Sequence, residues 1–224
     1  MKIDFDALIF DFDGVLLESE YVGNAHIATY LSSIGHPTTP ADSMANFMGL
    51  AGKDFIQAIE SWMGRPLPDD FHGIRAEENQ RVLDEGVDAV AGAIAFIQAL
   101  PADLPRAIAS SSSTEWIRRH LDHLGLRGAF PDRFIFSGKE HVVHGKPAPD
   151  VYLLAARELG VEIGCTVIIE DSPVGVTGAV ASGATVIGLC AGQHCGLDHG
   201  DRLRALGAHH VAAGFDEVAA LLDL

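Results

Sequence analysis

Two aspartates separated by one residue are the first side chains in this sequence with an evident chemical use. Asp11 and Asp13 follow directly after the short apolar run 7–10. A carboxylate can attack phosphorus and divide one difficult displacement into two easier steps. A second carboxylate nearby can protonate the leaving oxygen and later deprotonate water. The pair therefore predicts phosphoryl transfer, with Asp11 as the nucleophile and Asp13 as the general acid and base.

Other polar residues follow, or lie beyond, other short apolar segments. They are Ser110, Ser111 and Ser112 after 106–109, Lys146 within 145–150 (GKPAPD), and Glu170 and Asp171 after 166–169. The carboxylates of Asp11, Glu170 and Asp171 offer hard oxygen ligands without a histidine or cysteine in these motifs, which predicts Mg²⁺ rather than Zn²⁺. Lys146 would supply a fixed positive charge for the phosphoryl oxygens. Ser110 and the backbone N–H groups after it would complete a phosphate cradle, and Gly14, Ser111 and Ser112 are expected to contact the substrate.

The segments around these residues predict alternating strands and helices. Apolar runs too short for a helix are expected to form the buried strands of a parallel sheet, at 7–10, 106–109, 134–136, 166–169 and 185–189. Helices are predicted over 114–124, 150–159 and 172–181. This alternation indicates an α/β fold, with a Rossmann-like, doubly wound parallel sheet. Ligands bind at the carboxyl ends of such strands, so the polar residues are expected to converge there.

One stretch interrupts the alternation. Between the first two predicted strands the sequence holds only helical segments, at 19–34, 40–47, 53–63 and 70–85, separated by turn-forming GHPTTP and GRPLPDD. We therefore predict an α/β core domain over 1–16 and 86–224, and an inserted all-helical cap domain over 17–85.

Composition excludes several classes of protein. The 224 residues are 48% hydrophobic and carry a formal charge of −16. The apolar content excludes global disorder, and the sequence contains no apolar run long enough to span a membrane. The negative charge disfavours nucleic acids and anionic lipids as partners. Three cysteines and a charged N-terminal segment predict a cytoplasmic protein, and the length suits a monomer or a homodimer.

Four motifs in order carry a family resemblance. They are 10–20 (FDFDGVLLESE), the segment that ends in Ser110, 145–150 (GKPAPD) and 168–184 (IIEDSPVGVTGAVASGA). Together they resemble the haloacid dehalogenase superfamily, in the branch that contains β-phosphoglucomutase and sugar-phosphate phosphatases, and 17–85 is similar to that family's helical cap. The resemblance implies that the backbone carbonyl of Asp13 also binds the metal, that Asp171 is the chief ligand with Glu170 in support, and that the cap sets the substrate.

Departures from the family's patterns favour one reaction. The dehalogenases lack the second aspartate, which is present here as Asp13, and the mutases carry a histidine near the position of Gly23. We therefore predict a Mg²⁺-dependent phosphohydrolase that acts on a small phosphorylated metabolite, such as a sugar phosphate or phosphoglycolate. A phosphomutase remains the alternative, as do a phosphonoacetaldehyde hydrolase that uses Lys53 and a catalytically silent binding protein. Lys53 and Arg75 are otherwise expected to pair with the distal part of the substrate.

Two further patterns favour structural roles. Cys190, His194, Cys195 and His199 have spacing that could hold a metal, but the glycine-rich segment AGQHCGLDHG is more typical of a connecting loop. The two tryptophans, Trp62 and Trp116, are expected to be core residues.

Overall fold

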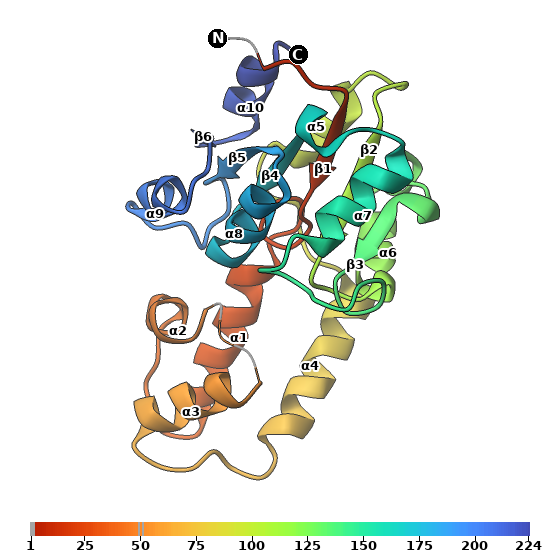
Figure 1. The fold of residues 1–224 in the computed structure, drawn as a ribbon. Coiled ribbons are helices and arrows are strands. Elements are labelled where there is room, and N and C mark those ends of the chain that lie inside the picture. Colours follow the sequence, from red (N-terminus) through yellow and green to blue (C-terminus); the bar gives the residue numbers. More distant parts are fainter. Residues whose placement is uncertain (1–2, 49, 51) are drawn as a thin grey trace. The chain divides into compact units, whose positions relative to one another are not determined.

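The computed structural model describes residues 3–48, 50 and 52–224, and the chain divides into two compact units. The core unit comprises Met1–Glu18 and Asp88–Leu224, and the helical unit comprises Ser19–Val87. Both boundaries lie two residues beyond those expected from the sequence. Figure 1 shows the strands in the core unit and the helices α1 to α4 in the helical unit.

The core unit is built on a six-stranded sheet with strand order β3-β2-β1-β4-β5-β6, and each neighbouring pair is parallel. The strands are β1 (Ala7–Phe10), β2 (Arg106–Ser110), β3 (Ile135–Ser137), β4 (Thr166–Glu170), β5 (Thr185–Leu189) and β6 (His210–Ala212). The predicted α/β fold is confirmed. The sixth strand was not predicted, because its three residues carry no apolar run that distinguishes them from a loop.

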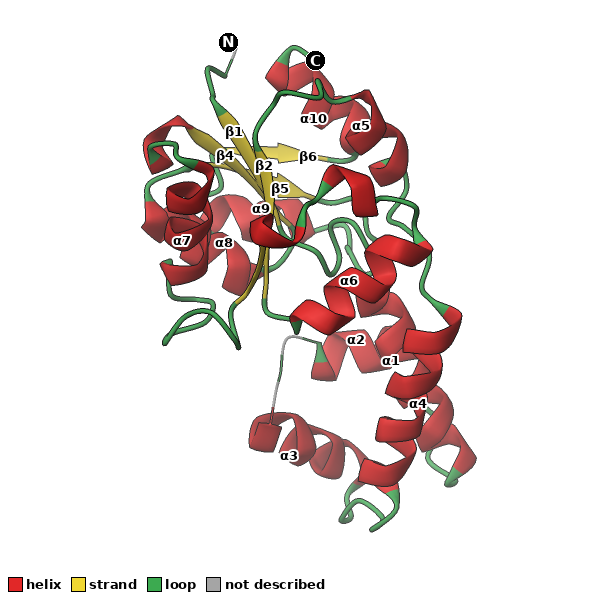
Figure 2. Cartoon of the chain, turned by 90° about the vertical axis from the view of Figure 1, so that its right-hand side faces the viewer, coloured by secondary structure: helices red, strands yellow, loops and turns green. Residues whose placement is uncertain are grey.

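Helices cover both faces of this sheet, as Figure 2 shows. On one face lie α7 (Asp150–Leu159), α8 (Pro173–Ser182) and α9 (His199–Ala205), and on the other lie α5 (Ala93–Ala99), α6 (Thr114–His123) and α10 (Phe215–Leu222). Because both faces are covered, every residue of β1, β2 and β4 is buried. This burial explains why those strands read as continuous apolar runs.

Local sequence signals fix the ends of two helices near the sheet. The side chain of Ser172 accepts a hydrogen bond from the backbone N–H of Gly175, and Pro173 occupies the first helical position of α8. Both features are typical of a helix N-terminus. Helix α7 ends at Gly160, which adopts a left-handed conformation with φ of 76°.

The helical unit contains α1 (Ser19–Ser33), α2 (Pro40–Phe47), α3 (Gly52–Met63) and α4 (Phe71–Glu85). Its core is a separate apolar cluster to which all four helices contribute, including Ile27, Leu31, Phe47, Ile59 and Phe71. Helix α2 begins with a capping box between Thr39 and Asp42. Among the residues that the structure describes, no helix is long and apolar enough to cross a membrane.

Candidate active site

The carboxyl ends of three central strands bring the predicted catalytic residues together. Phe10, the last residue of β1, pairs with Ile108 of β2 and with Ile169 of β4. The residues that follow therefore leave the sheet side by side. Asp11 comes next after β1, and Glu170 is the last residue of β4. Both side chains are buried, with Asp11 6% exposed and Glu170 fully enclosed.

Lys146 lies between these two carboxylates. Its Nζ atom donates to Asp11 Oδ1 at 2.7 Å and to Glu170 Oε1 at 2.5 Å, and its side chain is 3% exposed. Tyr152 of α7 donates its hydroxyl to the same Glu170 oxygen at 2.6 Å, and its ring centroid lies 5.1 Å from Lys146 Nζ. The lysine is therefore held in place by two carboxylates and an aromatic ring.

The charges in this cluster do not balance. Burial, and then the charge of Glu170, raises the pKa of Asp11 well above its usual range, although Lys146 opposes the shift. Burial would lower the pKa of Lys146, but Asp11 and Glu170 more than offset it and the pKa is raised. Lys146 is therefore protonated, while the cluster still carries more carboxylates than cations.

Asp13 belongs to a second group of hydrogen bonds at the end of β2. Its Oδ2 atom accepts from the hydroxyl of Ser112 at 2.6 Å and from that of Ser110 at 3.3 Å. Its Oδ1 atom accepts from the indole Nε1 of Trp116, on α6, at 3.0 Å. Three donors thus hold the half-buried Asp13 carboxylate.

Asp171 is held by two histidines from the segment after β5. His194 Nε2 lies 2.8 Å from Asp171 Oδ2, and His199 Nε2 lies 2.6 Å from the backbone oxygen of Asp171. Gly14 packs against the same carboxylate, since a Cβ atom there would lie 1.9 Å from Asp171 Oδ2. Gly14 also has a φ of 77°, which side chains rarely adopt, so only glycine suits this position.

Two groups of side chains in the described residues have the composition of metal sites. Asp11, Glu170 and Asp171 are all buried, and each offers a ligand atom within 4.8 Å of the others. His194, Cys195 and His199 form the second group by the same measure. The first group is the one predicted from the sequence.

The remaining predicted residues lie elsewhere. Ser111 is exposed beside Ser112. Lys53 is exposed in the first turn of α3, and Arg75 is half-buried on α4, so both belong to the helical unit.

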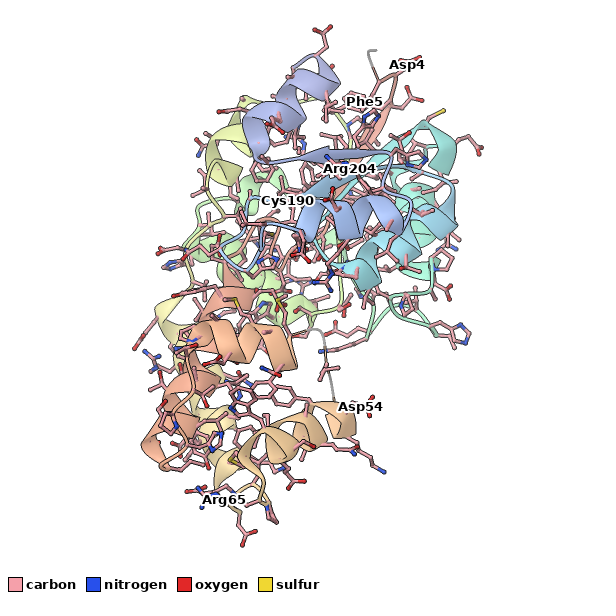
Figure 3. The ribbon with its side chains drawn as sticks, turned by 90° about the vertical axis from the view of Figure 1, so that its left-hand side faces the viewer. Asp4, Phe5, Asp54, Arg65, Cys190 and Arg204 are labelled. Carbon is pink, nitrogen blue, oxygen red and sulfur yellow. The ribbon has the colours of Figure 1, made fainter. Side chains whose placement is uncertain are left out.

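One sequence interpretation was wrong. Trp116 is half-buried and contacts Asp13 instead of filling the core, because its helix begins right after the serine loop. The segment after β5 is a connecting loop up to the start of α9 at His199, as expected, but the side chains of His194 and His199 are buried in it. Figure 3 shows α9 with Arg204 labelled, and Cys190 beside it at the end of β5.

Three residues of the site were therefore missed, namely Tyr152, Trp116 and His194. Tyr152 follows Lys146 by six residues and resembles the apolar residues of α7 in the sequence. Trp116 stands four residues after Ser112, a spacing that could have placed it at the first turn of the next helix. His194 was noted for its spacing to Cys195, but no signal in the sequence links it to Asp171.

Comparison with known proteins agrees with this geometry. Residues 5–183 match the family of haloacid dehalogenase-like hydrolases. Hexitol phosphatase A of Escherichia coli is 32% identical over 82% of this chain and 82% of its own length. The 6-phosphogluconate phosphatase of the same organism is 27% identical over 84% of each chain. A haloacid dehalogenase family hydrolase from Deinococcus radiodurans, solved with bound phosphate and sodium, is 31% identical, with a TM-score of 0.88 over 99% of this chain and 97% of its own.

The family match covers the first three motifs and all but the last residue of the fourth, and the structural neighbour shares the whole fold. This chain therefore belongs to the haloacid dehalogenase-like hydrolase family.

Proposed function

We propose that this chain is a Mg²⁺-dependent phosphatase that releases phosphate from a small phosphorylated metabolite through an aspartyl phosphate on Asp11. The observation that carries the proposal is the buried cluster in which Lys146 bridges Asp11 and Glu170, with Asp171 beside them. Two similar proteins named as phosphatases and a similar structure with bound phosphate support it.

The donor set fits Mg²⁺. Three buried carboxylates lie around Lys146, and burial, followed by the charge of Glu170, raises the pKa of Asp11. All three groups are hard oxygen donors, which Mg²⁺ prefers. Asp11, Glu170 and Asp171, with the backbone carbonyl of Asp13, would hold the ion. When bound, Mg²⁺ supplies positive charge that lets a phosphate dianion approach the carboxylates.

The first step transfers the phosphoryl group to the protein. A carboxylate oxygen of Asp11 forms a bond to phosphorus while the bond from phosphorus to the ester oxygen breaks. Asp13 gives its proton to that oxygen, and the product alcohol leaves. Lys146, 2.7 Å from Asp11, stabilises the negative charge on the transferring oxygens.

The second step returns the protein to its starting state. Asp13, now a carboxylate, takes a proton from a water molecule whose oxygen attacks phosphorus, and the bond between phosphorus and Asp11 breaks. Inorganic phosphate leaves. Ser110, Ser112 and Trp116 hold Asp13 for both proton transfers, since each donates a hydrogen bond to its carboxylate.

The helical unit would supply substrate choice. Lys53 and Arg75 are its candidate anchors for the distal part of the substrate. Lys53 is exposed. Burial lowers the pKa of Arg75, and the charge of Glu78 opposes this shift. Replacing either by Met should change the order of preferred substrates and raise their KM, while the rate at saturation falls much less.

The test is phosphate release from a panel of phosphoesters and one phosphonate, with and without Mg²⁺. The panel holds sugar phosphates, 6-phosphogluconate, phosphoglycolate and phosphonoacetaldehyde. We expect Mg²⁺-dependent release that Asp11→Asn lowers by at least about a thousandfold. Asp4→Asn, which removes an exposed acid from the same segment, is the matched control and should behave as wild type.

Other outcomes would overturn the proposal. Substantial Mg²⁺-dependent release by Asp11→Asn would exclude an aspartyl phosphate on that residue. Transfer of phosphate to a sugar without release would indicate a mutase, and release from phosphonoacetaldehyde alone would direct attention to Lys53.

A further inference from the structure

The segment that runs from the end of β5 to the first residue of α9 holds Asp171 at two points. His194 Nε2 contacts the carboxylate at 2.8 Å, and both side chains are almost fully buried, at 2% and 3% exposed. His199 Nε2 contacts the backbone oxygen of the same residue at 2.6 Å. One segment therefore restrains both the side chain and the main chain of a single aspartate.

Two nearby glycines leave room for the imidazole ring of His194 beside Asp171. A Cβ atom at Gly192 would lie 2.4 Å from His194 Cε1, and one at Gly14 would lie 3.1 Å from the same atom. The neighbouring backbone is also tied down, because Gln193 N donates to both carboxylate oxygens of Glu18 at 3.2 Å. Glu18 is itself 5% exposed. The imidazole is thus confined between two glycines, with its loop anchored one residue away.

We propose that His194 is a positioning residue that orients the Asp171 carboxylate for metal binding. The inference rests on the proposed function, since Asp171 is there a ligand of the metal. His194 engages one of the two carboxylate oxygens, which fixes the plane in which the carboxylate presents the other. Hydrogen-bond partners of metal-binding carboxylates commonly change metal affinity about 10- to 100-fold when they are removed.

The same histidines are poorly placed to form a metal site of their own with Cys195. The Nε2 atoms of His194 and His199 already contact Asp171. The geometry favours orientation of Asp171 over a separate zinc site.

The test is calorimetric titration of Mg²⁺ into the purified full-length protein without substrate. We expect His194→Ala to raise the dissociation constant of Mg²⁺ about 10- to 100-fold. His194→Gln should bind Mg²⁺ more tightly than His194→Ala, because a glutamine amide can still donate to the carboxylate. Phosphate release by His194→Ala should be deficient at limiting Mg²⁺ and recover at saturating Mg²⁺, which general damage to the fold would not reproduce.

Gln193→Ala is the matched control, since it alters the exposed side chain of the preceding residue and keeps the backbone N–H that donates to Glu18. Its affinity for Mg²⁺ should equal that of wild type. Wild-type affinity in His194→Ala would overturn the inference, as would an equal loss in Gln193→Ala or a His194→Gln no better than His194→Ala. Failure of the wild type to bind Mg²⁺ would instead overturn the proposed function, and this inference with it.

Discussion

Two glycines beside the buried carboxylates of the core unit and two glycines of the helical unit have opposite surroundings. In the core unit, a Cβ atom at Gly14 would lie 1.9 Å from Asp171 Oδ2, and one at Gly175 would lie 2.1 Å from the Glu170 carboxylate. In the helical unit, Cβ atoms at Gly23 and Gly73 would meet nothing within 4 Å. Glycine is therefore a packing requirement at positions 14 and 175, beside the buried carboxylates, and optional at positions 23 and 73.

Two charged side chains, one from each unit, also differ in how far they are buried. Lys146 of the core unit is 3% exposed and bridges two buried carboxylates. Arg81 of the helical unit is 49% exposed and pairs with Glu78 and Glu85 on its own helix. Exposed pairs of that kind contribute little to stability. The comparison indicates that the proposed active site is crowded around Lys146, whereas an exposed charge such as Arg81 can vary in sequence at low cost.

The largest expected effect on stability comes from replacing a lysine, and substitutions of two lysines test the contrast. Lys146→Met leaves Asp11 and Glu170 buried without their cation, so the free energy of unfolding should fall by about 3–5 kcal/mol, and phosphate release should be lost. Lys53→Met removes an exposed charge and should change stability by less than about 0.5 kcal/mol. Urea denaturation measures both. A Lys146→Met variant as stable as wild type would show that the buried carboxylates do not need the lysine.

A smaller effect is expected from Gly175→Ala. The added methyl group must displace the Glu170 carboxylate, which Lys146 and Tyr152 also contact. Overpacking of this kind costs about 1–3 kcal/mol, and phosphate release should fall with it. Gly164→Ala is the control in the same unit, because a Cβ atom there meets nothing within 4 Å. Equal thermal denaturation of the two variants would contradict the crowding that the structure describes.

The two tryptophans allow a third comparison. Trp116→Phe keeps an aromatic ring but removes the indole donor to Asp13, so kcat/KM should fall about two- to tenfold, as expected for one hydrogen bond worth about 0.5–1.5 kcal/mol. The two serine donors remain, which limits the loss. Trp62→Phe removes a hydrogen bond to Thr38 in the helical unit and should leave kcat within about twofold. Equal kcat/KM values for Trp116→Phe and Trp62→Phe in steady-state kinetics would exclude a positioning role for Trp116.

The same contrast explains what the sequence could predict. Asp11, Lys146 and Glu170 stand next to strands and turns that have strong local signals, so their convergence followed from the parallel sheet alone. The contact between His194 and Asp171 joins residues 23 positions apart through a loop conformation, which no local pattern encodes. Strand β6 has three residues, too few to show the alternation of apolar and polar residues that predicts a strand. For Lys53 and Arg75, the sequence shows a positive charge but no partner that would indicate the role of that charge.

The smallest expected effect is a gain in stability in the helical unit. Gly23 lies within α1, where glycine costs about 0.5–1 kcal/mol relative to alanine because it has more backbone freedom to lose on folding. A Cβ atom there meets nothing within 4 Å, so Gly23→Ala should raise the free energy of unfolding by about that amount. Thermal denaturation of Gly23→Ala beside Gly175→Ala should therefore give shifts of opposite sign. A loss of stability in Gly23→Ala would mean that this face of α1 is packed, and that the helical unit is as constrained as the core.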